Sequence, residues 1–583
     1  MRSRMMLPAV LVAAALLAPA TAGAQVPPLP FGHLCVPKDG VRFCPTLIDA
    51  QRVPSFDGVP LDVDVTLPAT GAGPFPTVVL LHEYGGSKTA FEGSGDYSAT
   101  GFARRGYAAV TPTARGFGRS CGVPDSRTPD CARGWQHLDD QRYEVRDIQQ
   151  LLGILVDEGI AKADALGAAG ASYGGEASAQ LAYLRDRIRL PDGSLAPWRS
   201  PAGRPLSLAA AAPGWMWWDL GWALTPNGRL LDPAAGAGAY KSPIGVSIQA
   251  YIDALYGLGA AYYLAPPGAD RTADLAVWKQ RTDRGEPFTP DVTVFLDELH
   301  RFHSVAGIPP TAPAPLLIQQ GRTDDLFPVG NALRVYDQLR ARNRRFPVSL
   351  QLGDLGHGPA GSHAAEQQAF TAGIFSFFDA WLKNGGKGAP APGSVTAYGQ
   401  VCPRNAPSGG APIRASSHSG LARGTLTLRA AARQPVTSSG GDASLSARLS
   451  PLTMDPCKPV KADVAPHTAI VTRRSPGFRL LGPAVIHLRA KLRGTYGELV
   501  GRLWDVDPRR GSQRLIDRGV TRVRHSGSVT FGLDGNAWKF ARGHTVKVEL
   551  LGRDGPTYRP SNTRFTITVS KLRVVLPTRE RRG

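Results

Sequence analysis

The stretch "GAAGASYGGEAS", Gly167–Ser178, places Ser172 between Gly170 and Gly174, after a short apolar run and before helix-forming residues. A Gly-x-Ser-x-Gly turn between a strand and a helix is typical of a nucleophilic serine, because small neighbours permit the strained backbone that exposes the hydroxyl. The alternative interpretation is a glycine-rich loop, since the chain holds 67 glycines and the pattern also arises by chance. The motif therefore needs an acid and a base further along the chain.

The segment around this motif, from about residue 46 to residue 381, alternates apolar runs with helical patterns. We interpret "TVVLLHEYGG" (77–86), "YAAVTPTARGFG" (107–118), "LGAAGAS" (166–172), "APLLIQQGRTDD" (314–325) and "FPVSLQLGDLGHG" (346–358) as strands and their following turns, and "RYEVRDIQQLLGILVDEG" (142–159) as an amphipathic helix. This alternation predicts an α/β fold with a mostly parallel sheet covered on both faces. Ligands of such sheets bind at the carboxyl ends of the strands.

The alternation stops between residues 184 and 308. This segment contains "GWMWWDLGW" (214–222) and the helical pattern "VSIQAYIDALYGLGAAYYL" (246–264), and we interpret it as a helical cap inserted over the site. Core packing accounts for most of its aromatic residues, so only a minority are expected to line a pocket.

A glycine- and proline-rich stretch, "LKNGGKGAPAPG" (382–393), reads as a linker. Short alternating runs separated by turn residues follow it, without helical patterns, and they predict a β-sandwich or jelly roll. We therefore expect a catalytic α/β domain over residues 25–392 and an all-β C-terminal domain over residues 393–583.

The first 24 residues have a basic start, an apolar core and the small-residue ending Ala22-Gly23-Ala24. These features predict a secretory signal peptide cleaved after Ala24. The alternative, a membrane-spanning helix, requires a longer apolar run of about 20 residues. We expect a secreted, soluble protein without a stable membrane span.

The six cysteines fall into three neighbouring pairs, Cys35 with Cys44, Cys121 with Cys131, and Cys402 with Cys457. An even number in an exported chain favours disulfides, and we expect these local pairings, although six cysteines allow 15 patterns. The spacing does not match a zinc finger, and we expect no metal and no cofactor.

The formal charge of +20 falls to +18 once Arg2 and Arg4 are removed with the signal. The basic residues are scattered among acids, so a solvated basic surface is the favoured interpretation and nucleic acid is not an expected partner. The oligomeric state does not follow from the sequence.

Two strand ends downstream of Ser172 supply a candidate acid and base in the order typical of α/β-hydrolases. In "GRTDDLFP", the position of Asp324 after the strand favours it over Asp325 as the acid that orients a histidine. In "LGHGPAGSH", His357 lies between two glycines and is favoured over His363 as the base. The alternative roles are a turn cap for the two aspartates and a surface position for the histidine.

Candidate oxyanion donors occur at two further places. The backbone N–H of Tyr173 follows the nucleophile. "HEYGG" (82–86) ends an earlier strand, where Tyr84 offers its backbone or its phenol as the second donor, whereas His82 is interpreted as structural.

Together these residues resemble the Xaa-Pro dipeptidyl-peptidase-like and cocaine-esterase-like serine hydrolases. The resemblance extends over nearly the whole chain, from "PSFDGVPLDVDVTLP" (54–68) through "GASYGG", "GRTDDLFP" and "GHG" to "VGRLWDVDP" (500–508) and "LGRDGPTYRPSN" (551–562). It implies an α/β-hydrolase domain, a helical cap and a C-terminal jelly roll. It also implies Ser172 as nucleophile, Asp324 as acid, His357 as base and Tyr84 as the oxyanion tyrosine.

Glu83 departs from the pattern, because many α/β-hydrolases have a glycine there, and its side chain adds bulk or charge beside the oxyanion loop. The secretion signal also departs from the cytosolic members of the family.

The expected reaction is hydrolysis of an ester or a small peptide or amide through an acyl-enzyme on Ser172. A dipeptidyl-peptidase would need an acid near the site to bind a free amine, and the cap offers Asp219, Asp253 and Glu298. An esterase needs only an apolar pocket, which "GWMWWDLGW" can supply. The alternatives are a carbohydrate-binding or polyanion-binding secreted protein without enzymatic activity.

Overall fold

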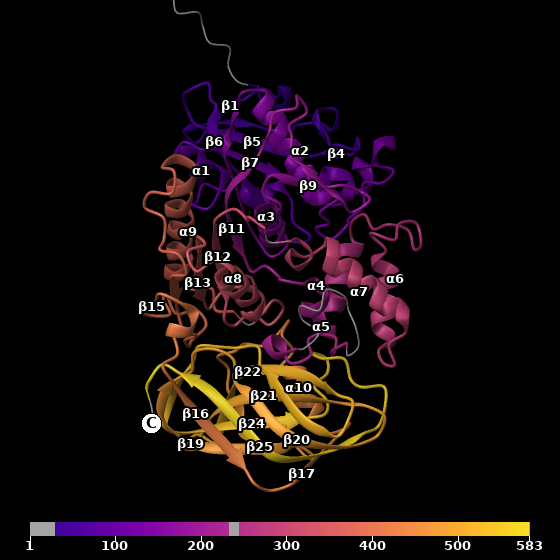
Figure 1. Ribbon diagram of the computed structural model, residues 1–583, viewed down its shortest axis with the longest axis vertical. Helices are drawn as coiled ribbons and strands as arrows, with labels where there is room; N and C mark the ends of the chain where they lie inside the picture. The colour runs from indigo at the N-terminus through magenta and orange to yellow at the C-terminus, as the bar shows by residue number, and fades with distance from the viewer. Residues whose placement is uncertain (1–28, 233–243, 310, 359, 582–583) are drawn as a thin grey trace, which may run out of the picture.

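The computed structural model describes residues 29–232, 244–309, 311–358 and 360–581. The signal peptide expected at residues 1–24 therefore lies outside the described residues. An α/β part occupies one end of the molecule and strands of the C-terminal third occupy the other (Figure 1).

One large mixed sheet organises the α/β part. Its strands lie in the order β1 (Val36–Lys38), β2 (Val41–Cys44), β5 (Val63–Leu67), β7 (Ala108–Pro112), β6 (Phe75–Leu81), β8 (Ala161–Ala171), β11 (Leu208–Gly214), β12 (Leu316–Gly321), β13 (Val348–Gly353), β14 (Val395–Ala397) and β15 (Ile413–Ala415). Neighbours from β7 to β14 pair in parallel, whereas the pairs at both edges of the sheet are antiparallel. The carboxyl ends of β6, β8, β12 and β13 consequently meet at one edge.

Helices cover both faces of this sheet. Helices α2 (Glu144–Asp157), α3 (Tyr173–Leu184) and α8 (Gly330–Arg342) contribute to the core on one face, and α1 (Ala99–Arg104) and α9 (Ala364–Phe378) contribute to the core on the other. The apolar central strands are buried on both sides, as expected for parallel strands. The predicted α/β class is thus observed.

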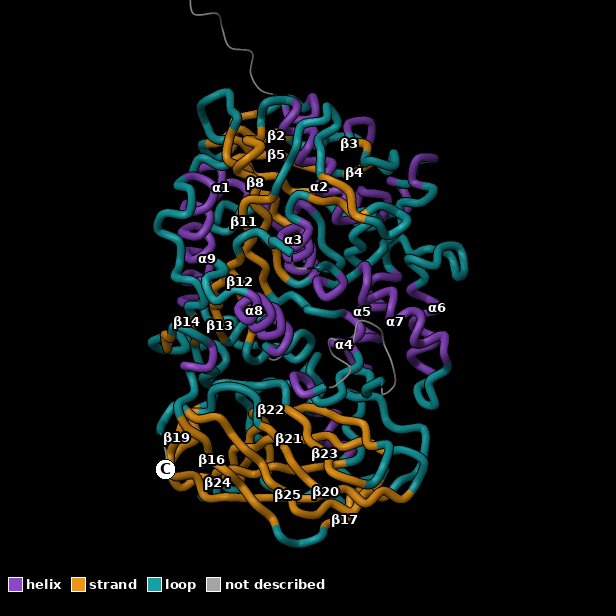
Figure 2. Tube along the Cα trace, in the orientation of Figure 1, coloured by secondary structure: helices purple, strands orange, loops and turns teal. Residues whose placement is uncertain are grey.

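The expected cap is interrupted by a strand. Residues 208–214, "LAAAAPG", form β11, which pairs in parallel with β8 and β12 in the middle of the sheet. The expected cap boundary at residue 184 is therefore wrong. The sequence did not indicate this strand, because an alanine-rich run lacks the β-branched residues typical of strands, and its strand conformation depends on pairing with β8 and β12. The segment above the site consists of α4 (Leu220–Leu224), α5 (Gln249–Ala260), α6 (Leu275–Arg284) and α7 (Pro290–Phe302), which lie together in Figure 2.

Two small hairpins, β3 (Val53–Pro54) with β4 (Pro60–Leu61) and β9 (Arg187–Arg189) with β10 (Leu195–Pro197), lie outside the main sheet.

The C-terminal third contains two five-stranded sheets and a short helix, α10 (Ala443–Arg448). The first has the order β16 (Gly424–Ala430), β25 (Thr566–Thr578), β20 (Val485–Arg493) and β23 (Gly527–Gly532), with β17 (Gln434–Thr437) also pairing with β25. The second has the order β18 (Val460–Lys461), β22 (Ser512–Val523), β21 (Gly497–Asp507), β24 (Lys539–Leu551) and β19 (Ala469–Arg479). Side chains of both sheets form one buried apolar cluster.

The expected domain boundary at residue 393 differs from the strand pairing. Strands β14 and β15 lie beyond that residue, yet β14 pairs with β13 and extends the central sheet. The glycine- and proline-rich stretch before them is therefore a connection within the α/β part. The sequence did not predict this, because a turn-rich composition does not reveal which sheet the next strand joins.

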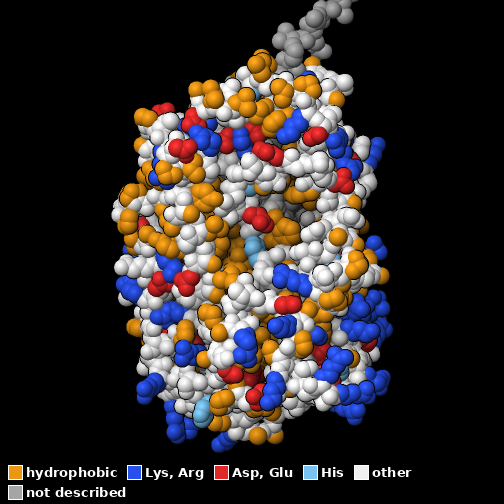
Figure 3. Space-filling view, turned by 180° about the vertical axis from the view of Figure 1, so that it is seen from behind, with side chains coloured by type: hydrophobic (Ala, Val, Ile, Leu, Met, Phe, Trp, Pro, Cys, Tyr) orange, Lys and Arg blue, Asp and Glu red, His pale blue; other side chains and the backbone are white. Residues whose placement is uncertain are grey.

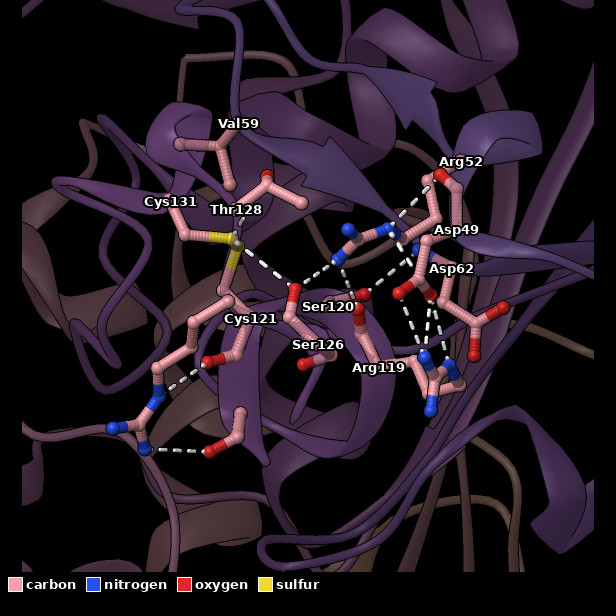
Figure 4. The surroundings of a disulfide bond; sticks show 12 residues. Asp49, Arg52, Val59, Asp62, Arg119, Ser120, Cys121, Ser126, Thr128 and Cys131 are labelled. Atoms are coloured by element: carbon pink, nitrogen blue, oxygen red, sulfur yellow. Dashed lines mark hydrogen bonds and ion pairs between the residues drawn. A yellow bond between two sulfur atoms is a disulfide. The ribbon is translucent and has the colours of Figure 1, made fainter. Parts of the chain in front are cut away.

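The three disulfides join the expected neighbours, Cys35 to Cys44, Cys121 to Cys131, and Cys402 to Cys457. Figure 4 shows the second of them, beside a loop in which the buried Arg52 side chain donates hydrogen bonds to the carbonyl oxygens of Arg119 (2.7 Å) and Ser126 (2.8 Å). Among the described residues, no helix is long and apolar enough to cross a membrane.

Candidate active site

Ser172 forms the sharp turn between β8 and α3. Its backbone has φ 55° and ψ −118°, a strained conformation for a residue other than glycine. A Cβ atom on Gly170 would lie 2.6 Å from backbone atoms of Gly174 and of Leu81, and one on Gly174 would lie 2.0 Å from the Leu81 carbonyl oxygen. The two glycines are therefore needed because the turn packs directly against the end of β6.

A chain of hydrogen bonds connects Ser172 with two side chains from other strand ends. The Ser172 Oγ atom lies 2.8 Å from Nε2 of His357, and Nδ1 of His357 lies 2.9 Å from Oδ2 of Asp324. Asp324 is buried, and its other oxygen accepts the backbone N–H groups of Leu326 (3.1 Å) and Phe327 (2.9 Å). These bonds hold the carboxylate so that it fixes the His357 ring with Nε2 facing the serine.

The alternative acid and base lie elsewhere. Asp325 accepts a hydrogen bond of 2.6 Å from the Tyr251 hydroxyl, and burial raises the pKa of its carboxyl to about 6. His363 lies 3.1 Å from Oδ2 of Asp354 and 2.5 Å from the carbonyl oxygen of Ala406. The structure thus brings Asp324 and His357 to Ser172, and Asp325 and His363 to other contacts.

The charge around His357 favours its protonated form. Burial lowers the pKa of the imidazole, but the charge and hydrogen bond of the Asp324 carboxylate, together with the charges of Glu83 and Asp325, outweigh this effect. The net pKa lies above the ordinary value. The aromatic ring of Phe327 packs edge-on against the imidazole at 5.3 Å between ring centroids.

Tyr84 follows the end of β6 and lines the same cavity as Ser172. Its hydroxyl donates a hydrogen bond of 2.7 Å to Oε1 of Gln136, whose amide nitrogen in turn donates to the carbonyl of Gly259 (3.0 Å). Burial raises the pKa of Tyr84, so the phenol stays a hydrogen-bond donor. Gln136 had no signal in the sequence, because only the fold brings it to this tyrosine.

Tyr173 presents its backbone and its side chain to different surroundings. Its N–H is the first of helix α3 and so has no partner within the helix. Its hydroxyl is buried, where it accepts from the N–H of Asp139 (3.0 Å) and donates to Glu144 (3.3 Å).

His82 braces the neighbouring turn, as expected from the sequence. Its Nδ1 lies 2.7 Å from the Glu83 carbonyl oxygen, and its Nε2 accepts the N–H of Ala114 at 2.9 Å. Burial lowers the pKa of His82 to about 4, so the ring is neutral.

An apolar cavity of about 140 Å³ opens onto Ser172. Residues of the overlying helices form most of its wall, with Trp217, Trp278 and Phe295 among the aromatic ones. Among the described residues, Lys279 is the one charged member of this wall, and its ammonium is paired with Asp253 (2.7 Å) and Asp283 (2.5 Å). Trp218 and Trp222 of the tryptophan-rich stretch are buried in the core instead.

None of the three candidate amine-binding acids forms part of this cavity wall. Asp219 lies 2.6 Å from Nδ1 of the buried His300 and caps helix α4. Asp253 is exposed and pairs with Lys279, and Glu298 pairs with Arg142. Their carboxylates are thus engaged outside the cavity.

One group of possible metal ligands occurs among the described residues, formed by Asp140, Glu298 and His303. The guanidinium of Arg142 forms ion pairs with both Asp140 and Glu298. Because this cation already neutralises the two carboxylates, we assign the group to a structural ion-pair network.

Comparison with known proteins shows a similarity to one hydrolase family and a shared fold. The large mixed sheet with the serine at the β8–α3 turn is consistent with an α/β-hydrolase-like fold. The model of the X-Pro dipeptidyl-peptidase (S15) family matches residues 57–187, which include Ser172 and Tyr84. No curated protein sequence matches the chain.

Solved structures extend the similarity along the chain. An α-amino acid ester hydrolase superposes with a TM-score of 0.56 at 17% identity, over 97% of this chain and 100% of its own. A CocE/NonD family hydrolase from Staphylococcus aureus has a TM-score of 0.55 at 14% identity over 92% and 94% of the chains. An aminopeptidase from a marine sediment Thaumarchaeota archaeon has 0.54 at 15% over 93% and 97%. The predicted resemblance to S15-type serine hydrolases is confirmed, and the solved structures show that the fold is shared.

Proposed function

We propose that this protein is a secreted serine hydrolase that cleaves ester or amide bonds through an acyl-enzyme on Ser172. The observation that carries the proposal is the continuous set of contacts from Ser172 Oγ through His357 to Asp324. Nucleophilic acyl transfer uses this arrangement, in which a strained turn holds a serine hydroxyl beside an imidazole and a carboxylate orients that imidazole.

In the proposed mechanism, Ser172 Oγ attacks the carbonyl carbon while His357 Nε2 takes its proton. Asp324 remains ionised, holds the Nδ1–H and stabilises the imidazolium. The oxyanion accepts the N–H of Tyr173 and the hydroxyl of Tyr84, which turns from Gln136 to reach it. His357 then protonates the leaving group, and water releases the acyl group by the reverse sequence of proton transfers.

The apolar cavity favours an esterase over a dipeptidyl-peptidase. Recognition of a free amino terminus inside this cavity needs an acidic side chain in its wall, and no carboxylate of the described residues lines the cavity that opens onto Ser172. A dry cavity of about 150 Å³ lined by aliphatic and aromatic side chains holds a benzene-sized group. We therefore infer that an uncharged apolar acyl group occupies this cavity.

The remaining parts of the proposal concern organisation and location. The two C-terminal sheets support a separate jelly-roll-like domain that starts near residue 424, after the last strand of the central sheet. Three disulfides fit an oxidising, extracellular environment.

The test is hydrolysis of p-nitrophenyl butyrate and of Ala-Pro p-nitroanilide by the protein after signal removal, with Ser172→Ala as the control. We expect serine-dependent cleavage of the ester and little or none of the anilide. Preferential cleavage of the anilide would contradict the esterase assignment, and full activity in Ser172→Ala would contradict the mechanism.

A further inference from the structure

The first C-terminal sheet, formed by β16, β17, β20, β23 and β25, has one apolar and one basic face. Along its strands, buried residues of the apolar cluster between the two sheets alternate with residues that point outward. Six of the outward residues are cations, namely Arg429, Arg489, Lys491, Arg493, Lys571 and Arg573. None of the five strands contains an aspartate or a glutamate, although the chain has 47 acidic residues. We call this outward surface the basic face.

Strand pairing brings the basic residues of this face close together. Arg573 of β25 lies opposite Arg429 of β16 on one side and opposite His487 of β20 on the other. Neighbouring strands lie about 4.8 Å apart, and like charges directly opposite each other destabilise a sheet. Burial and the charge of Arg573 lower the pKa of His487. Because this row of basic residues does not favour folding, it points to a partner outside the chain.

A β-bulge adds one more cation to the basic face. The pairing of β20 with β25 shifts between His487 and Arg489, so that Lys571 is an extra residue in β25. Lys571 has φ 52°, which lies in the left-handed region that is uncommon for residues other than glycine. Bulges re-aim side chains, and at this one Lys571 is exposed beside Arg573.

The cations of the basic face have no acidic partner within the described part of the chain, since none of the six takes part in an ion pair there. The second C-terminal sheet differs, because its strands contain acids, namely Glu498, Asp505, Asp507, Asp517 and Glu549. One of them, Asp505, lies 2.9 Å from Nδ1 of His544. The lack of acids is therefore a property of one sheet and not of the whole domain.

The basic sheet lies far from the candidate active site. Figure 1 shows β17, β20 and β25 toward the end of the molecule away from the α/β part. In Figure 3, which presents the opposite side, Lys and Arg side chains are concentrated around the same end of the molecule. A partner bound there would leave the entrance to Ser172 open.

The neutral residues between the cations indicate which class of anion fits. Several of them carry hydroxyl groups, namely Thr425, Thr427, Ser528, Thr530 and Thr568, which can donate to and accept from sugar hydroxyls. The one Phe, Tyr or Trp residue of these strands, Phe531, is buried, so no such ring is available to stack on a nucleic acid base. The exposed large hydrophobic residues of the described chain all lie outside these strands, so the face lacks the apolar groups that insert into a lipid surface.

We propose that the basic face binds an anionic polysaccharide, whose sulfate or carboxylate groups pair with the cations and whose hydroxyl groups bond to the threonines and serines. Along β20, the alternate residues Arg489, Lys491 and Arg493 are about 6.8 Å apart. Such rows of cations on a flat sheet suit a repeating polymer better than a single small anion. The inference goes beyond the proposed hydrolase activity and does not depend on it.

The test measures the binding of fluorescently labelled heparin, polygalacturonate and uncharged dextran to the protein after signal removal, by fluorescence anisotropy. We expect binding of the two anionic polymers and none of dextran. The triple variant Arg429→Gln/Arg489→Gln/Lys491→Gln should bind heparin at least about tenfold more weakly. Its Kd should also depend less steeply on salt concentration, because fewer counterions are released on binding.

The triple variant Arg344→Gln/Arg345→Gln/Lys387→Gln is the matched control, since it removes the same charge from exposed positions of the α/β part. It should bind heparin as the wild type does. Equal losses in the two triple variants would assign the binding to net charge and overturn the proposal. Absence of binding to the wild type would overturn it as well.

Two further measurements separate the alternatives. Duplex DNA and phosphatidylglycerol vesicles are titrated in the same way, and tighter binding of either than of both anionic polysaccharides would overturn the proposal in favour of that partner. The thermal midpoint of the variant of the basic face should equal or exceed that of the wild type, because loss of the Arg429 charge relieves its repulsion with Arg573. A lower midpoint would mean that these cations serve the fold, which contradicts the inference.

Discussion

The Nδ1 atom of His357 lies 2.9 Å from Oδ2 of Asp324, whereas the adjacent Asp325 turns to the Tyr251 hydroxyl at 2.6 Å. Two neighbouring carboxylates thus have different partners, and replacing them should have different effects. Asp324→Asn keeps the size of the side chain but favours the wrong imidazole tautomer, so we expect a loss of kcat of about 10⁴-fold.

Asp325→Asn is the control for this change. It alters the adjacent carboxyl, which accepts a hydrogen bond from the Tyr251 hydroxyl and does not touch His357, so its effect on kcat should be far smaller. Steady-state kinetics with p-nitrophenyl butyrate measure both. Equal losses in the two variants would mean that Asp324 acts through folding and not through His357.

The fold and the candidate site differ in how far they follow from sequence. The strands before Ser172, Asp324 and His357 could be predicted because each is an apolar run that ends in a turn, and parallel pairing brings their ends together. Strand β11 could not, because four alanines carry no strand signal and its position depends on β8 and β12. The contact between Gln136 and Tyr84 also escapes prediction, since 52 residues separate the two in sequence.

Tyr84→Phe tests the second oxyanion donor. The change removes one hydroxyl and keeps the ring that packs edge-on against Phe117 at 5.1 Å between centroids. Loss of one oxyanion donor typically reduces kcat by about 100- to 1,000-fold, and we expect a value in that range with a smaller change in KM. If kcat were unchanged in Tyr84→Phe, the second oxyanion donor would have to be a backbone N–H instead of the Tyr84 hydroxyl.

The pH dependence of the reaction should follow His357. The base must be neutral to accept the serine proton, and Asp324 raises the pKa of the imidazole above its ordinary value of about 6.5. Activity is therefore lost as the pH falls through this raised pKa and is regained as the pH rises through it.

Asp324→Asn should move this midpoint to lower pH, because the imidazolium loses its anionic partner. The residual activity of the variant, followed as kcat/KM against pH, checks the direction of the shift. A midpoint that moves upward would exclude Asp324 as the source of the raised pKa.

An ion pair links the α/β part to the C-terminal sheets. The guanidinium of Arg229 pairs with Asp534, and both side chains are buried. Arg229→Met leaves the Asp534 charge without its partner and should lower the free energy of unfolding by about 3–5 kcal/mol. Urea denaturation measures this change.

The double variant Arg229→Met/Asp534→Asn is the control, because it removes both charges. We expect it to recover a large part of the lost stability, since replacing a buried pair with uncharged residues often costs little. If the double variant were as unstable as the single one, packing around Arg229 and not the ion pair would hold the two parts together.

The size of the apolar cavity should set the acyl length. Leu255 of helix α5 is partly exposed and lines this cavity, so the larger ring of Leu255→Trp should fill part of the cavity. We expect kcat/KM for p-nitrophenyl hexanoate to fall at least about tenfold relative to the acetate ester, because a pocket discriminates strongly against groups that no longer fit. Ala254→Trp places the same ring one residue earlier, at an exposed position outside the cavity wall, and should leave the preference unchanged. If the Leu255→Trp enzyme kept the acyl-length profile of the wild type, the acyl group would have to lie outside this cavity.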